Sequence, residues 1–127
     1  DEALDKAVDN IKKKVTASSG GIKIAAKAPA RVYRYEELED EMKAYYATIR
    51  QTIRNAWSLP DILRNRGYKT VLAIHVLKDG TVQSLWIDEK SGNNFYDETT
   101  VRAINKVTLP PLPKVWKEES IDLGFNF

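Results

Sequence analysis

The strongest helical pattern in the chain runs from about Tyr35 to Trp57, where apolar residues recur every three or four positions. Acidic residues crowd its first turns and arginines lie near its end, an arrangement that the helix dipole favours. Pro60 favours an end at or before Leu59, because the residue ahead of a proline is disfavoured in the helical region. The apolar positions that we expect to face the core are Leu38, Met42, Tyr45, Ile49, Ile53 and Trp57 (or Ala56).

Two runs rich in Val, Leu, Ile and Thr, residues 68–77 and 82–89, are separated by a turn that contains Asp79-Gly80. Asp-Gly between apolar runs is the strongest short-range signal for a β-hairpin. A two-residue turn would place Ile74 opposite Leu85 on the better core face. The first residue of the second run then falls on the other face, which either caps the hairpin end or indicates a β-bulge.

A short helix and a last strand complete the folded part of the chain. Asp97 is a plausible N-cap for a helix that carries Val101, Ile104 and Val107. The proline-rich residues 109–113 end this helix and force an extended connection. Residues 121–127 alternate apolar with small or polar residues, which predicts a one-sided strand.

The N-terminal part of the chain has a different composition. Residues 1–15 carry a narrow apolar stripe at helical spacing, and residues 18–30 are rich in Ser, Gly, Ala and Lys, which favours a flexible linker. We therefore divide the chain into a helix and linker over residues 1–34 and a folded domain over residues 35–127. Three strands with helices on one face predict an α+β fold of two layers, with a three-stranded antiparallel sheet.

Composition excludes several kinds of chemistry. The 127 residues hold 20 Lys and Arg against 18 Asp and Glu, a net charge of +2, with no cysteine and one histidine. Thiolate zinc sites and cysteine nucleophiles are excluded, and we find no glycine-rich phosphate loop, no nucleophile paired with a base and no cluster of metal ligands. We expect no enzymatic activity, no catalytic residue, no cofactor and no metal. The lone His75 is interpreted as a surface or cross-strand residue.

One alternative of another class is a small α+β nucleic-acid-binding module. Basic residues concentrate between the long helix and the first strand of the hairpin, and small α+β domains often bind RNA. The net charge is low and the strands carry no RNP-like aromatic motif, so we expect no nucleic-acid partner. The basic residues are Arg50, Arg54, Arg64, Arg66 and Lys69.

Taken together in order, these features resemble the C-terminal domain of the TonB and TolA energy-transducing proteins, over roughly residues 42–127. The specificity lies in the order and compact spacing, because no single feature is diagnostic. The matching features are Tyr45-Tyr46, Ile49, Ile53, Trp57, Pro60, the Val-rich strand, Asp79-Gly80-Thr81-Val82, Ser91-Gly92, Phe95 with Asp97, Ala103-Ile104, the Pro110-Pro111-Leu112-Pro113 run and the alternating last strand. The charged, Ala- and Lys-containing N-terminal region is more similar to the TolA stalk than to the proline-dense TonB stalk, although the paired cysteines of TolA domains are absent.

The resemblance implies a periplasmic domain at the end of a stalk that is anchored in the inner membrane beside a proton-driven motor complex. It also implies that the last strand pairs with the first and stays exposed at one edge of the sheet. The partners that it implies are outer-membrane-associated: a periplasmic β-propeller, a lipoprotein or a receptor plug peptide. Free copies of such a domain can also form a strand-exchanged homodimer.

An exposed strand edge accepts another strand unless charges, prolines or bulges block it. The last strand has few such blockers, so we hypothesise that it docks a partner peptide by β-strand addition. An ordinary edge, or a strand that swaps in a dimer, is the competing interpretation. Backbone pairing alone yields only a few kcal/mol, so side chains beside the strand must contribute. The predicted partner-binding residues are Ile121, Asp122, Leu123, Gly124, Phe125 and Asn126 on the strand, with Trp57, Leu59, Pro60 and Trp116 as walls.

Overall fold

The computed structural model describes residues 22–127 of the chain. The helix predicted over residues 1–15 lies outside the described residues. The described part contains two α-helices, α2 (Asp40–Ala56) and α3 (Asn94–Lys106), and two short 3₁₀ helices, η1 (Tyr35–Glu37) and η2 (Asp61–Leu63). Its strands are β1 (Lys23–Ile24), β2 (Val71–Leu77), β3 (Val82–Glu89) and β4 (Ser120–Asn126).

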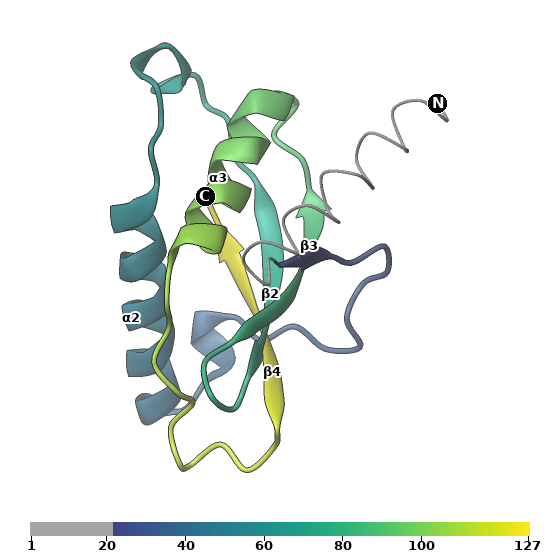
Figure 1. Cartoon of the computed structure of the whole chain (residues 1–127), viewed down its shortest axis with the longest axis vertical. Helices are drawn as coiled ribbons and strands as arrows, with labels where there is room; N and C mark the ends of the chain where they lie inside the picture. The colour runs from purple at the N-terminus through teal and green to yellow at the C-terminus, as the bar shows by residue number, and fades with distance from the viewer. Residues whose placement is uncertain (1–21) are drawn as a thin grey trace.

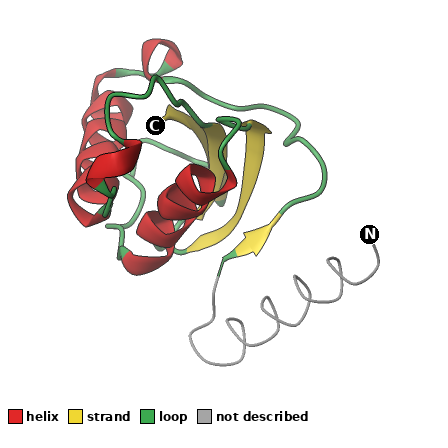
Figure 2. Ribbon diagram, turned by 90° about the horizontal axis from the view of Figure 1, so that it is seen from above, coloured by secondary structure: helices red, strands yellow, loops and turns green. Residues whose placement is uncertain are grey.

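The four strands form one sheet in the order β1-β3-β2-β4. The two-layer α+β prediction is confirmed, because α2 and α3 lie on the same side of the sheet (Figures 1 and 2). The predicted count of three antiparallel strands is wrong by one. β1 is an extra strand that runs parallel to β3, whereas β2 is antiparallel to both of its neighbours.

Residues 23 and 24 fall inside the segment predicted as a flexible linker. They pair with Ser84 and Leu85 of β3, and the Ala25 N–H donates to the Leu85 carbonyl at 2.7 Å. Ile22 and Ile24 are partly buried against the core. This part of the predicted linker is therefore a strand of the folded domain, while the domain boundary at residue 34 stays a prediction.

The hairpin follows the predicted register over most of its length. Ile74 pairs with Leu85, but a register shift after His75 makes Val76 pair with Val82. The bulge interpretation is therefore the correct one at the turn end of the hairpin. Gly80 has a φ of +93°, and a Cβ there would lie 2.4 Å from the Leu109 carbonyl oxygen, so this turn requires glycine.

The core fills the space between the helices and the sheet. The predicted apolar face is confirmed for Met42, Tyr45, Ile49 and Ile53, which are buried in α2. Leu38 is buried just before the helix, whereas Ala56 and Trp57 are only partly buried. The long helix begins five residues later than predicted, because η1 and a short extended stretch precede it. The largest completely buried side chains are Phe125, Ile49, Ile53, Leu72, Ile74, Leu85, Ile104, Leu123 and Val76.

Asp97 is not the N-cap of α3. Asn93 caps this helix, with its side-chain oxygen accepting the Tyr96 N–H at 3.0 Å. Asp97 is instead buried in the first turn, where Oδ1 accepts the Thr70 hydroxyl at 2.6 Å and the Ser91 N–H at 3.0 Å. This carboxylate ties the start of β2 to the turn after β3, and so fixes one end of the sheet.

Candidate functional site

β4 lies at one end of the sheet order, so one side of its backbone faces β2 and the other faces away from the sheet. Phe127, just after the strand, exchanges two hydrogen bonds with Thr70 on the β2 side, at 2.7 and 2.9 Å. Backbone direction alternates along an antiparallel strand. The N–H and C=O groups that face outward therefore belong to Ser120, Asp122, Gly124 and Asn126.

The apolar residues of β4 face the core. Ile121, Leu123 and Phe125 are 2%, 0% and 1% exposed, and their backbone groups pair with β2. These three predicted partner-binding residues therefore have neither their side chains nor their backbone groups available to a binding partner. Of the six predicted strand residues, only Asp122, Gly124 and Asn126 present their backbone at the outer edge.

The expected exposed edge is occupied in part by the chain itself. Tyr33 forms a parallel bridge with Leu123. The Tyr33 N–H donates to the Asp122 carbonyl at 2.8 Å, and the Tyr33 carbonyl accepts the Gly124 N–H at 2.9 Å. The prediction that the whole edge of the last strand stays exposed is therefore wrong at its centre.

Two aromatic side chains engage further outward carbonyls. The buried Tyr46 hydroxyl donates to the Gly124 carbonyl, and the Trp116 indole Nε1–H donates to the Ser120 carbonyl at 2.9 Å. Burial raises the pKa of Tyr46, so the hydroxyl keeps its proton and remains a donor at neutral pH. Trp116, a predicted wall, thus lies beside the N-terminal end of β4, and its role in partner binding stays a prediction.

The C-terminal end of the edge is open among the described residues. No hydrogen bond within residues 22–127 engages the outward N–H or C=O of Asn126, whose side chain is exposed. A hollow of about 200 Å³ adjoins it, which we call the edge groove. The edge groove is lined by Arg34, Tyr35, Glu36, Tyr46, Arg50, Gly124 and Asn126.

The surface along the edge groove is positively charged. A second hollow of about 460 Å³ shares Tyr35, Tyr46 and Arg50 with the edge groove and extends it along α2 to Arg54. Neither Arg50 nor Arg54 forms a salt bridge within the described part of the chain. Glu36 is the one acidic residue that lines either hollow. The positive charge of the edge groove and of its extension along α2 therefore favours an acidic binding partner.

The other predicted walls lie at the far end of β4. Trp57 and Leu59 line a separate hollow of about 310 Å³ beside Phe127. The Trp57 Nε1–H donates to the Thr99 hydroxyl at 2.8 Å, so this indole is committed to α3. Pro60 is exposed and does not line that hollow. With a strand rise of about 3.4 Å per residue, about 20 Å separates these residues from Trp116, so the predicted walls do not form one pocket.

Two of the basic residues of the nucleic-acid alternative are tied to their own loop. The Arg64 Nε–H donates to the Leu59 carbonyl at 3.2 Å, and the Arg66 Nε–H donates to the Ile62 carbonyl at 3.1 Å. Arg64 also pairs with Asp61 at 3.5 Å. These contacts support the loop and offer no reason to prefer a nucleic-acid ligand.

His75 has a cross-strand partner that its own strand does not reveal. Its Nδ1 lies 2.9 Å from Oδ1 of Asp122 in β4, on the face of the sheet opposite the helices. The sequence interpretation as a cross-strand histidine is confirmed. This contact holds the Asp122 side chain against β2.

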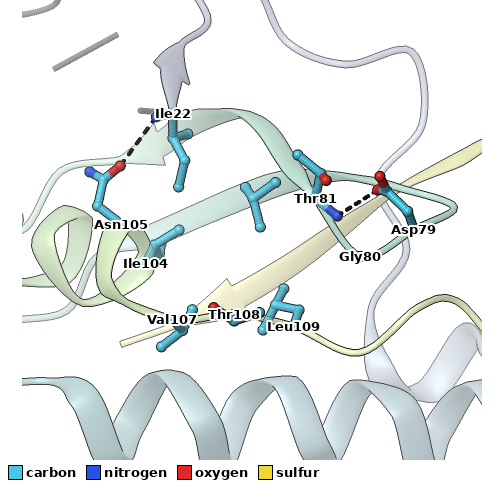
Figure 3. Close-up of a pocket in the computed structure, with 10 residues that line it drawn as sticks. Ile22, Asp79, Gly80, Thr81, Ile104, Asn105, Val107, Thr108 and Leu109 are labelled. Carbon is cyan, nitrogen blue, oxygen red and sulfur yellow. Dashed lines mark hydrogen bonds between the residues drawn. The ribbon is translucent and has the colours of Figure 1, made fainter. Parts of the chain in front are cut away.

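A further hollow of about 250 Å³ lies between the hairpin turn and the end of α3, as Figure 3 shows. The Ile22 N–H donates to Asn105 Oδ1 at 3.2 Å across one side of it, and the Thr81 N–H donates to Asp79 Oδ1 at 2.9 Å at the other. The hydrogen bond from Thr81 lowers the pKa of Asp79. The Ile22 N–H and the Thr81 N–H therefore both have acceptors within the fold, and we assign this hollow no binding role.

Sequence reasoning missed the residues that complete the edge: Tyr33, Arg34, Tyr46 and Ser120. Val32-Tyr33 is a β-branched and aromatic pair, a short strand signal inside a segment that we interpreted as a linker. Tyr46 was recognised for its place in the family pattern, but the helical stripe did not include it. Its acceptor, the Gly124 carbonyl, is 78 positions away along the chain.

Within residues 22–127, no group of three or more His, Cys, Asp or Glu side chains is placed to hold a metal ion. No helix in the same part of the chain is long and apolar enough to cross a membrane.

A family model described as "TonB C terminal" matches residues 42–127, which is more than half of the chain. The match covers all but the first two residues of α2, together with the hairpin, α3 and β4. No curated protein and no solved structure matches the chain. Domains of this family are non-enzymatic parts of energy transducers, are generally periplasmic and interact with outer-membrane-associated proteins. This chain belongs to the TonB C-terminal family, and residues 42–127 are its energy-transducer-type domain.

Proposed function

We propose that this domain binds outer-membrane-associated proteins by strand addition at the outer edge of β4. The single observation that carries the proposal is the edge itself. β4 ends the sheet, it presents the backbone of Asp122, Gly124 and Asn126 outward, and it already accepts one parallel backbone contact from Tyr33. An edge that pairs with a segment of its own chain has the geometry to pair with a peptide.

The strength of such a contact depends on more than the backbone. Four to six hydrogen bonds of roughly 0.5–1.5 kcal/mol give a few kcal/mol, whereas micromolar binding needs about 8 kcal/mol. The edge groove supplies the remaining contacts in this proposal, because Tyr46 and Arg50 of α2 line it together with Gly124 and Asn126. A peptide with carboxylates next to its paired residues fits this surface, and its association rate falls as salt is added.

In this proposal the domain is the periplasmic end of a transducer that is anchored in the inner membrane. Binding at β4 then couples the proton-motive force of the inner membrane to a receptor plug peptide, a lipoprotein or a β-propeller at the outer membrane. The TolA-like branch depends on the composition of the N-terminal residues and is part of the proposal. A strand-exchanged homodimer would use the same edge, and sedimentation of the free chain distinguishes it from a monomer.

A proline at position 126 tests the proposal, because the Asn126 N–H faces outward and its loss leaves the bonds to β2 intact. We expect an outer-membrane fraction to yield the same captured proteins with wild type and Asn126→Ala, and at least about tenfold less of them with Asn126→Pro. The alanine variant is the matched control, because it removes the side chain and keeps the N–H. Undiminished capture by Asn126→Pro would show that the edge of β4 is not the docking site.

A further inference from the structure

Residues 22–34, which we call the strap, join the two ends of the sheet. Lys23–Ile24 pair with β3 at one end of the strand order, and Tyr33 pairs with β4 at the other. Residues 25–32 therefore pass from one edge of the sheet to the other. Figure 2 shows this connection running around the side of the sheet that the helices leave open.

The strap lies close against β4 because position 124 is a glycine. A Cβ on Gly124 would lie 2.8 Å from Cγ1 of Val32, closer than real Cβ contacts. Side chains alternate along a strand, so this contact is on the face opposite the core residues Leu123 and Phe125. Gly124 thereby lets the strap approach the edge closely enough to hydrogen-bond with it.

The attachment at β4 is short and partly exposed. Its backbone component is one bridged residue, Tyr33, with two hydrogen bonds. The Tyr33 ring meets Trp116 edge-on at 5.3 Å between centroids, and the Arg31 guanidinium lies 4.4 Å from the centre of the Tyr33 ring. Arg31 and Arg34 are exposed, whereas Tyr33 is only half-buried. A contact of this size is small enough to open while the sheet remains folded.

The strap uses the groups that an added strand needs. The Asp122 carbonyl and the Gly124 N–H are the central outward groups of β4, and both are bonded to Tyr33. A partner strand cannot use them in register until Tyr33 leaves. We infer that residues 31–34 are an internal competitor for the docking edge, and that a partner peptide binds by displacing them.

This inference rests on the proposed function for the identity of the binding partner. The competition for the edge of β4 is a property of the chain itself. Because a partner binds only the open form, its apparent dissociation constant is raised by the inverse of the fraction of molecules in which the edge is free. A partner that lies parallel to β4, as Tyr33 does, recovers the same two hydrogen bonds.

Amide hydrogen exchange of the wild-type chain tests whether the edge is occupied. The Gly124 N–H is bonded to the strap, whereas the Asn126 N–H also faces outward and has no partner in the described residues. We expect Gly124 to exchange at least about tenfold more slowly than Asn126, a factor that corresponds to about 1.4 kcal/mol. Equal exchange rates at the Gly124 and Asn126 amides would overturn the inference.

A titration then tests the competition without any outer-membrane protein. The probe is a capped peptide with the sequence of residues 29–36, added at up to millimolar concentration to isotope-labelled chain, with the amide signals of Asp122 and Gly124 as the readout. Tyr33→Pro removes the N–H that donates to Asp122 and the ring that packs on Trp116. Ala30→Pro is the matched control, because Ala30 is exposed and makes no hydrogen bond among those described.

We expect the peptide to bind Tyr33→Pro at least about tenfold more tightly than it binds wild type or Ala30→Pro. A peptide whose own Tyr33 is replaced by proline should bind no variant. Equal binding to all three chains, or no binding to Tyr33→Pro, would overturn the inference. The titration with the residue 29–36 peptide and the capture of outer-membrane proteins test different claims. If the peptide behaves as expected but no outer-membrane protein is captured, the result counts against the proposed function and leaves the competition intact.

Discussion

Replacing Tyr46 with phenylalanine tests the link between α2 and the strand edge. The ring of Tyr46 stacks on Phe125 with centroids 4.3 Å apart, and phenylalanine keeps that contact. The substitution removes only the hydroxyl that donates to the Gly124 carbonyl. Its effect on stability therefore reports one hydrogen bond at the edge of β4.

The size of the effect depends on whether water reaches the carbonyl that is left without a donor. Loss of a hydrogen bond costs roughly 0.5–1.5 kcal/mol, and a completely buried unsatisfied group costs about 1–3 kcal/mol. Tyr46 and Gly124 are both buried but also line the edge groove, so the overlap of the two ranges, about 1–1.5 kcal/mol, applies. We expect a loss of about 1 kcal/mol in the free energy of unfolding.

Urea denaturation followed by tryptophan fluorescence measures this loss. With a denaturant slope of about 1–3 kcal/mol per molar for a small domain, the unfolding midpoint should fall by about 0.3–1 M. Tyr35→Phe is the control, because Tyr35 is 44% exposed and its hydroxyl has no hydrogen bond in the described residues. If Tyr46→Phe and Tyr35→Phe unfold at the same midpoint, the hydroxyl does not hold the edge in the manner described.

Three further predictions concern the rest of the fold. Gly80→Ala should lower the free energy of unfolding by about 2 kcal/mol or more in denaturation, because φ is positive at this position and a Cβ there would clash with the Leu109 carbonyl. An unchanged unfolding midpoint would refute this. Asp97→Ala should lower the free energy of unfolding by about 2–3 kcal/mol, because the Thr70 hydroxyl and the Ser91 N–H lose their acceptor. The control Glu98→Ala, at an exposed position, should change the free energy of unfolding by no more than about 0.5 kcal/mol. Burial raises the pKa of Tyr45 to about 12, so the folded state retains a proton that the unfolded state loses near pH 10. Stability should therefore fall as pH rises from 10 toward 12, and Tyr45→Phe should weaken that dependence in denaturation measured across this range; an identical slope would contradict it.

Local patterns were sufficient for the elements whose signals lie within a few residues. The stripe along α2 predicted its buried face because helix periodicity and burial follow the same spacing. Asp79-Gly80 predicted the hairpin and its main register for a similar reason, and the position of Val82 left a bulge as one of two interpretations. The alternation in residues 121–127 predicted β4 and its core-facing side chains.

The strap and the edge depend on contacts between distant residues, which such patterns do not contain. Lys23–Ile24 is too short a strand to produce an alternating signal, and its stability comes from β3. The composition of the segment indicated a linker, but tertiary contacts of Ile22, Ile24 and Tyr33 outweigh that local preference. The sequence therefore predicted which strand is the docking candidate, but not that the chain covers its centre.

The same limit explains the predicted walls. Trp57, Leu59 and Pro60 are close in sequence, and Trp116 precedes β4, but strand length places these two groups at opposite ends of the edge. The groups that do line the open edge, Arg50 and Arg34, come from α2 and from the segment before η1. Only the assembled fold brings them together beside Asn126.

The central claim is that an outer-membrane-associated partner lies along the outer edge of β4. Photo-crosslinking in intact cells that express the protein is the sharpest test, with a photoreactive residue at position 126 and, as the matched control, at the exposed position 83 of β3. We expect crosslinks to outer-membrane-associated proteins from position 126 that are absent from position 83. Crosslinks from position 83 with none from position 126 would contradict it.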